Sequence, residues 1–180
     1  MINLAEKRNV SFMKLLSTTQ EQFSKFISED RADKFAKTFV SKANMQKQWE
    51  HCIGYWEEEE LLGAIITTVS KRKPHVANLQ LLHTFAKHRR KGVARILTQD
   101  ALERAISNDS EYFRVSAEPG AVDFYKSMGF RFFCKQKSGC QLSMFKINGP
   151  SYTSGLYDRE DVIIDKALSK KGKGGCWEYL

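Results

Sequence analysis

The stretch 78–106 constrains the fold more than any other part of this 180-residue chain. From about 76 to 85 the sequence is apolar enough for a strand, and from Gly92 on it has the periodicity of a helix. The loop between them carries four basic side chains, Lys87, Arg89, Arg90 and Lys91. The first N–H groups of a helix have no partner inside it, and the helix dipole places partial positive charge there. Such a turn therefore predicts an anion site, and its glycine lets a phosphate approach the backbone.

Apolar and aromatic periodicity predicts a chain that alternates strands with helices and contains no internal repeat. Strands are expected at 10–16, 49–56, 61–69, 76–85, 111–117, 131–136 and 140–147. Helices are expected within 17–30, at about 31–45, from Gly92 to the stop at 108–110, and from Pro119 to the closing Gly129. The strand, helix and strand that begin at 76 should cross over into a parallel pair.

Two local details add to this outline. In the helix at 31–45, Phe35 and Phe39 share one stripe, and the helix is expected to cover the core. The acidic link Glu57–Glu60 separates two strands, which predicts a hairpin with a solvated tip. Attraction of a substrate amine to these carboxylates is the less favoured interpretation.

The composition suits one globular domain, because 42% of the residues are hydrophobic. No apolar run approaches the ~18 residues that cross a bilayer, and the first ten residues lack a signal-peptide pattern. We therefore expect a cytoplasmic protein without membrane association. The four cysteines form no C-x-x-C pair, so buried free thiols are expected and a metal site is not.

The positive charge is concentrated in one region. The net charge is +8, and Ser70–Arg95 contains eight Lys or Arg and no Asp or Glu. A polyphosphate cofactor, a nucleic acid, or both would account for this excess. A solvated basic face without a partner is the plain alternative.

From Gly149 the character of the sequence changes. We expect a first domain at 1–148 and a C-terminal extension at 149–180, with a short helix near 158–168 and a basic, Gly-containing tail. The sequence leaves open whether this tail docks on the domain. It also leaves open whether the protein is a monomer or a homodimer.

Two short motifs point to a family. Residues 89–94 fit the pattern Q/R-x-x-G-x-G/A, and a second pattern, A-x-x-F-Y-x-x-x-G-F, is present at 121–130. One helix, one strand and one turn separate the motifs. Over about 10–147, the motifs and the element order resemble the GCN5-related N-acetyltransferase (GNAT) superfamily. The resemblance implies an α/β fold, with a mixed central sheet of about six to seven strands and helices on both faces.

The resemblance also implies acetyl-CoA as co-substrate. Its pyrophosphate would lie on the backbone N–H groups of about Arg90–Ala94, and its pantetheine along His83–Phe85, where the family's strand bulges away from its parallel neighbour. The 3′-phosphate is a further target for basic side chains of the loop. The residues expected to contact the cofactor are His83, Thr84, Phe85, Lys87, Arg89, Arg90, Lys91, Gly92, Val93, Ala94 and Tyr125.

Three catalytic roles follow from the resemblance. Tyr125 matches the family's tyrosine, which protonates the leaving thiolate. A backbone N–H around Phe85 would stabilise the oxyanion. Many members carry a glutamate base on the strand before the loop, but this strand offers Gln80 and His83, and His83 is the candidate because its ordinary pKa lies near neutrality. Many members also carry an asparagine near the second motif, where this chain has Glu118 and Pro119.

The acceptor is not fixed by the fold. The first hypothesis is N-acetylation of a primary amine on a small molecule, a peptide or a lysine. A second is an amine carried by nucleic acid, such as aminoacyl-tRNA or a modified base, which the basic region 70–95 motivates. A third is a binding module that keeps the fold without catalysis.

Overall fold

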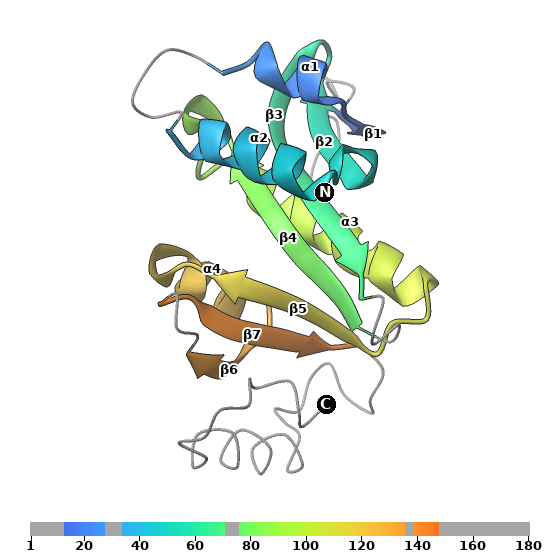
Figure 1. Ribbon diagram of the computed structural model, residues 1–180, viewed down its shortest axis with the longest axis vertical. Coiled ribbons are helices and arrows are strands. Elements are labelled where there is room, and N and C mark those ends of the chain that lie inside the picture. The colour runs from blue at the N-terminus through green and yellow to red at the C-terminus, as the bar shows by residue number, and fades with distance from the viewer. Residues whose placement is uncertain (1–12, 28–33, 71–75, 136–138, 148–180) are drawn as a thin grey trace, which may run out of the picture. The chain divides into compact units, whose positions relative to one another are not determined.

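The computed structural model describes residues 13–27, 34–70, 76–135 and 139–147 (Figure 1). Its strands form a seven-stranded mixed sheet in the order β1-β2-β3-β4-β5-β7-β6, which confirms the expected sheet. The described residues fall into two compact units. The first takes the described residues up to Thr68 together with Gln80–Glu103, and the second takes Val69–Leu79 and the residues from Arg104 on.

The first unit contains most of the helical structure. Its strands are β1 (Met13–Ser17), β2 (Cys52–Glu57), and the greater parts of β3 (Glu60–Val69) and β4 (Val76–Thr84). Its helices are α1 (Gln20–Ser24), α2 (Lys34–Gln46), the 3-10 turns η2 (Trp49–His51) and η3 (Ala86–His88), and most of α3 (Val93–Ser107). The strand predicted from 49 therefore starts three residues later. The cause is local, because the N–H of His51 donates to the carbonyl of Gln48 at 3.0 Å and closes a turn.

Strands β2 and β3 form the expected hairpin. They pair antiparallel from Glu57 and Glu60, so only Glu58 and Glu59 make the turn, and both of these side chains are exposed. The register shifts beyond the turn, because Trp56 pairs with Leu61 while Tyr55 pairs with Gly63. Leu62 is thus the extra residue of a β-bulge, which locally frees its carbonyl from the ladder.

Helices α1 and α2 cover one face of β2 and β3. Thr19 caps α1 in a capping box, accepting from the N–H of Gln22 at 3.2 Å while the Gln22 side chain accepts from the N–H of Thr19 at 2.8 Å. Phe23 then stacks on Phe39 with ring centroids 4.7 Å apart. The inward face of α2 is Ala36, Phe39 and Ala43.

The expectation that the stripe of Phe35 and Phe39 lies in the core holds only for Phe39. Phe39 is 3% exposed, whereas Phe35 is 56% exposed. Residues four apart on a helix are offset by about 40° around its axis, so a narrow buried face can take one of them and leave the other outside. The buried positions 36, 39 and 43 define that face, and Phe35 lies at its edge.

Helix α3 covers the opposite face of β3. Ala64 belongs to the cluster with Phe23 and Phe39, and neighbouring strand residues point to opposite faces. A Cβ built on Gly63 would lie 2.9 Å from Cγ1 of Val93 and 3.3 Å from Cδ1 of Leu97, both in α3. It would also lie 2.6 Å from the carbonyl oxygen of His83. Within this unit, helices therefore lie on both faces of the sheet, as predicted (Figure 1).

The second unit consists of shorter elements. They are β5 (Tyr112–Ala117), η4 (Pro119–Ala121), α4 (Val122–Ser127), β6 (Arg131–Lys135) and β7 (Gln141–Lys146). The predicted parallel pair is confirmed, since Val76–Leu79 of β4 pairs with Tyr112–Val115 of β5. β5 and β7 pair antiparallel, as do β6 and β7.

Gly129 ends α4 as the sequence predicted. Its φ is +89°, and its N–H donates to the carbonyl of Lys126 at 3.0 Å. The N–H of Phe130 donates to the carbonyl of Tyr125 at 3.0 Å, which completes a Schellman motif. The motif turns the Phe130 ring toward Phe113, with centroids 5.7 Å apart.

Of the helices in the described part of the chain, none has both the length and the apolar composition needed to cross a bilayer. Cys52 is a buried free thiol, as expected, and burial raises its pKa to about 12. Cys140 is a free thiol that is partly exposed. The extension predicted at 149–180 lies outside the described residues, as does the run of basic residues at 71–73.

We expect Gly63→Ala to lower the free energy of unfolding by about 1–3 kcal/mol, because the new methyl group meets backbone and packed side chains. Chemical denaturation measures the change. Gly120→Ala is the matched control, since a Cβ there meets nothing within 4 Å. Equal stability of the two variants would contradict a close contact between α3 and β3.

Candidate functional site

The turn between β4 and α3 is fixed by backbone hydrogen bonds. The N–H of Phe85 donates to the carbonyl of Leu62, the bulge residue of β3, at 3.1 Å. The N–H of His88 then donates to the carbonyl of Phe85 at 2.9 Å and closes η3. The end of β4 and the start of the turn are thereby tied to β3.

The next residues make an open cradle of backbone amides. Arg90 has φ +63° and Gly92 has φ +84°, and a Cβ on Gly92 would meet nothing within 4 Å. The N–H of Ile96, in the first turn of α3, donates to the carbonyl of Gly92 at 3.0 Å. Within the described residues, the amides of Arg90–Ala94 donate no hydrogen bond. They are therefore available to an anion at the positive end of a 15-residue helix.

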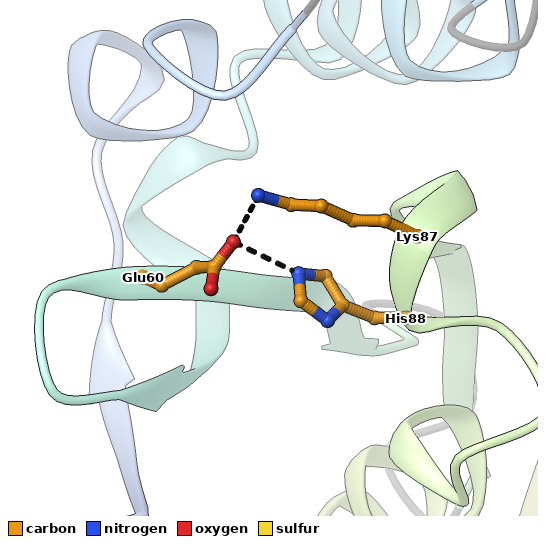
Figure 2. A network of polar contacts seen from close by, with 3 residues as sticks. All are labelled: Glu60, Lys87 and His88. Atoms are coloured by element: carbon orange, nitrogen blue, oxygen red, sulfur yellow. Dashed lines mark hydrogen bonds and ion pairs between the residues drawn. The ribbon is translucent and has the colours of Figure 1, made fainter.

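The basic side chains of the turn differ in their contacts. Nε of Arg89 donates to the carbonyl oxygen of Thr84 at 3.3 Å, while Arg90 and Lys91 are exposed. Nζ of Lys87 forms an ion pair with Oε1 of Glu60 at the start of β3 (Figure 2). Lys87 is 65% exposed, so its ammonium group is near solvent as well.

The strand residues predicted to contact the cofactor are only partly accessible. His83 is 5% exposed, and its ring lies among Phe23, Phe39 and Phe85 at centroid distances of 5.9, 6.3 and 5.0 Å. Oγ1 of Thr84 is buried without a hydrogen-bond partner in the described part of the chain. The N–H of Phe85 donates to the carbonyl of Leu62, so the oxyanion donor predicted around Phe85 would have to be a neighbouring amide.

Tyr125, the predicted acid, lies on α4 in the second unit. Its side chain is 5% exposed, with Phe124 and Phe130 rings 5.0 and 5.4 Å away. Burial raises the pKa of Tyr125 well above that of a free phenol, so the hydroxyl keeps its proton at neutral pH.

Sequence reasoning missed three residues that shape the turn. His88 is 6% exposed, and its Nε2 lies 3.1 Å from Oε1 of Glu60, so the carboxylate holds both neighbouring side chains of η3. Leu62 supplies the carbonyl that anchors Phe85. Glu60 was visible only as part of an acidic run, and no sequence pattern marks its pairing with a residue 28 positions away.

Comparison with known proteins agrees with this geometry. Residues 17–145 match the sequence model of the acetyltransferase (GNAT) domain. The chain belongs to the GNAT acetyltransferase family. Among curated protein sequences, none is similar enough to count as a match.

Solved structures share the fold at low sequence identity. The Ard1 protein of Thermoplasma volcanium is 14% identical, with TM-score 0.61 over 76% of this chain and 99% of that chain. The PaiA N-acetyltransferase of Thermoplasma acidophilum, solved in complex with coenzyme A, is 13% identical, with TM-score 0.58 over 74% and 98%. The ribosomal-protein-S18-alanine N-acetyltransferase of Escherichia coli is 17% identical, with TM-score 0.55 over 80% and 99%.

Membership of the family makes this chain an acyltransferase with acetyl-CoA as co-substrate. The residues present fit that molecule. The space beside Gly92 admits a phosphate, the amides of Arg90–Ala94 supply donors, and Oγ1 of Thr84 is a buried polar atom with no described partner. Within the described residues no cluster of His, Cys, Asp or Glu is arranged to hold a metal ion.

We expect Gly92→Ala to weaken coenzyme A binding by about tenfold or more, because the methyl group occupies the space that a phosphate would enter, and tenfold is ~1.4 kcal/mol. Isothermal titration calorimetry measures the dissociation constant. Gly139→Ala is the matched control, since Gly139 has φ +87° and equally open surroundings, and both changes add similar backbone strain. The same weakening in both variants would show that strain alone is responsible.

Proposed function

We propose that this protein transfers the acetyl group of acetyl-CoA to a primary amine, on a small molecule, a peptide or a lysine. The observation that carries the proposal is the open amide cradle at Arg90–Ala94, ahead of α3 and beside a glycine in the left-handed region. The cradle supports binding of a pyrophosphate, and the family's co-substrate carries one.

Bound acetyl-CoA would supply a thioester carbonyl that a neutral amine attacks. The chain's own contribution begins with binding. The amides of Arg90–Ala94 would hold the pyrophosphate, and Oγ1 of Thr84 would offer a further polar contact. Arg89 and Lys91 would add positive charge, while Lys87 would first have to leave Glu60. Holding two reactants in one geometry supplies a large share of the rate in such reactions.

Tyr125 is proposed as the general acid. Burial raises the pKa of Tyr125, so Oη keeps its proton in the neutral range. Donation of this proton to the departing thiolate would leave a tyrosinate, which the proton released by the amine would restore through solvent. The oxyanion donor is proposed to be an amide close to Phe85, since the Phe85 N–H itself is engaged.

His83 keeps the chemistry of a base, but its surroundings do not favour that role. The ring is packed against three phenylalanines in the core of the first unit. A base must come within hydrogen-bonding reach of the proton it removes, directly or through one water. We therefore assign no proton-transfer step to His83 and propose that the amine loses its proton to solvent.

A nucleic-acid-borne amine is the second candidate acceptor. The motivating observation is that Lys87, Arg89, Arg90 and Lys91 are all exposed on one turn. If the cofactor alone accounts for this charge, added RNA will leave turnover unchanged.

The proposed function predicts that acetyl-CoA stabilises the wild-type protein, by ~2.7 kcal/mol at a hundred times its dissociation constant. Thermal unfolding with and without the ligand measures this. A screen with labelled acetyl-CoA against amines, peptides, lysine-containing peptides and charged tRNA then identifies the acceptor. Stabilisation without transfer to any primary amine would overturn the proposal.

We expect Tyr125→Phe to lower kcat by about 10²-fold or more, since general acid catalysis contributes about 10²–10⁴. Coenzyme A affinity should be retained, because the substitution removes only Oη. Steady-state kinetics and calorimetry separate the two effects. Tyr55→Phe, which removes the hydroxyl of a buried tyrosine of β2, controls for general loss of a phenol. Full turnover in Tyr125→Phe would exclude Tyr125 as the acid.

A further inference from the structure

A single carboxylate joins the cofactor turn to the start of β3. Oε1 of Glu60 accepts from Nζ of Lys87 and lies 3.1 Å from Nε2 of His88 (Figure 2). The three side chains differ in burial, since that of His88 is 7% exposed, that of Glu60 39% and that of Lys87 65%. The buried member of the network is therefore the histidine of the turn.

The direction of the histidine hydrogen bond follows from the state of Glu60. The hydrogen bond from Lys87 is the largest effect on the pKa of Glu60 and lowers it. Desolvation comes second and raises the pKa, while the hydrogen bond from His88 and the charges of Lys87 and His88 lower it further, so the net shift is downward. The group is thus an ionised carboxylate at neutral pH and can only accept. Nε2 of His88 must carry the hydrogen and donate it, which fixes the ring relative to β3.

Charge alone makes this arrangement unfavourable for an anion site. A carboxylate close to a phosphate-binding turn repels phosphate and neutralises Lys87, one of the cations of the turn. On electrostatic grounds, removal of Glu60 should therefore strengthen binding of coenzyme A. If Glu60 instead holds the turn in its binding conformation, its removal should weaken binding of coenzyme A.

The conformation of the turn gives a reason for holding it. Arg90 has φ +63°, and this left-handed conformation persists at a non-glycine residue only where the surroundings over-determine it. Backbone hydrogen bonds fix the start of the turn, because the N–H of Phe85 donates to Leu62 and the N–H of His88 donates to Phe85. The buried His88 side chain adds a tie at the last residue of η3, two positions before Arg90.

We propose that Glu60 and His88 are positioning residues that hold the β4–α3 turn in the conformation that binds the pyrophosphate of coenzyme A. The proposal rests on the cofactor site of the proposed function. The pair acts through the amides of Arg90–Ala94 and touches no reacting atom. Its contribution appears in cofactor affinity and not in the chemical step.

The test compares dissociation constants of coenzyme A and of dephospho-coenzyme A, which lacks the 3′-phosphate. We expect Glu60→Ala and His88→Ala each to weaken both ligands by about tenfold, because the pyrophosphate is common to both. Glu59→Ala, which removes the same charge from an exposed neighbouring side chain, should leave both constants within about twofold, because exposed charges interact weakly. His88→Gln, whose amide can still donate to Glu60, should recover most of the affinity.

A double-mutant cycle decides whether the two residues act as a unit. The double variant should bind no worse than either single variant, because each change already breaks the same tie. Additive losses would overturn the proposal. So would Glu60→Ala binding as tightly as the wild type or more tightly, and so would a loss confined to coenzyme A, which assigns the effect to Lys87 at the 3′-phosphate.

Thermal unfolding without ligand shows whether each variant is folded. If Glu60→Ala does not fold, the dissociation constants of His88→Gln and His88→Ala are compared instead. Equally weakened coenzyme A binding in these two variants would overturn the proposal. A wild-type protein that binds neither ligand would overturn the cofactor site itself. Binding by the wild type together with unaltered binding by the variants would overturn only the positioning role.

Discussion

The structure of the first unit depends on the close approach of the β4 backbone at His83 to the β3 backbone at Gly63. With no Cβ at this position, the His83 carbonyl and the Val93 side chain both come near β3. The neighbouring Leu62, displaced from the ladder by the bulge, gives its carbonyl to Phe85. Leu62 and Gly63 of β3 thus contact both the turn that follows β4 and the first turn of α3.

The anion cradle that we propose at Arg90–Ala94 follows this anchored turn and is built mainly from backbone amides. Backbone amides in fixed positions present partial positive charge to an anion. They avoid the loss of conformational entropy that long basic side chains undergo on binding. The side chains around the cradle serve different ends. Lys87 and His88 face Glu60, Arg89 reaches back to Thr84, and Arg90 accepts a left-handed backbone. A count of cations in the sequence therefore overstates the charge that is free to meet a phosphate.

The parts that the sequence predicted are those set by neighbouring residues. The strand, turn and helix around Gly92, the Schellman end at Gly129 and the hairpin at Glu58–Glu59 each follow from a few consecutive positions. The misses come from distant partners or from small offsets. The Glu60–His88 contact joins residues 28 positions apart. The amide of Phe85 donates to the residue of a β-bulge that no sequence pattern indicates. Phe35 lies at the edge of the narrow buried face of α2 and is exposed. The site residues as a set stay predictions until ligand binding is measured.

Both compact units are discontinuous along the chain. β4 supplies Val76–Leu79 to one unit and Gln80–Thr84 to the other, and α3 is shared in the same way at Glu103 and Arg104. No single cut of the polypeptide can release either unit whole. Because β4 and α3 each belong partly to both units, unfolding of one unit would disrupt a strand and a helix of the other. Heating should therefore produce a single cooperative calorimetric transition.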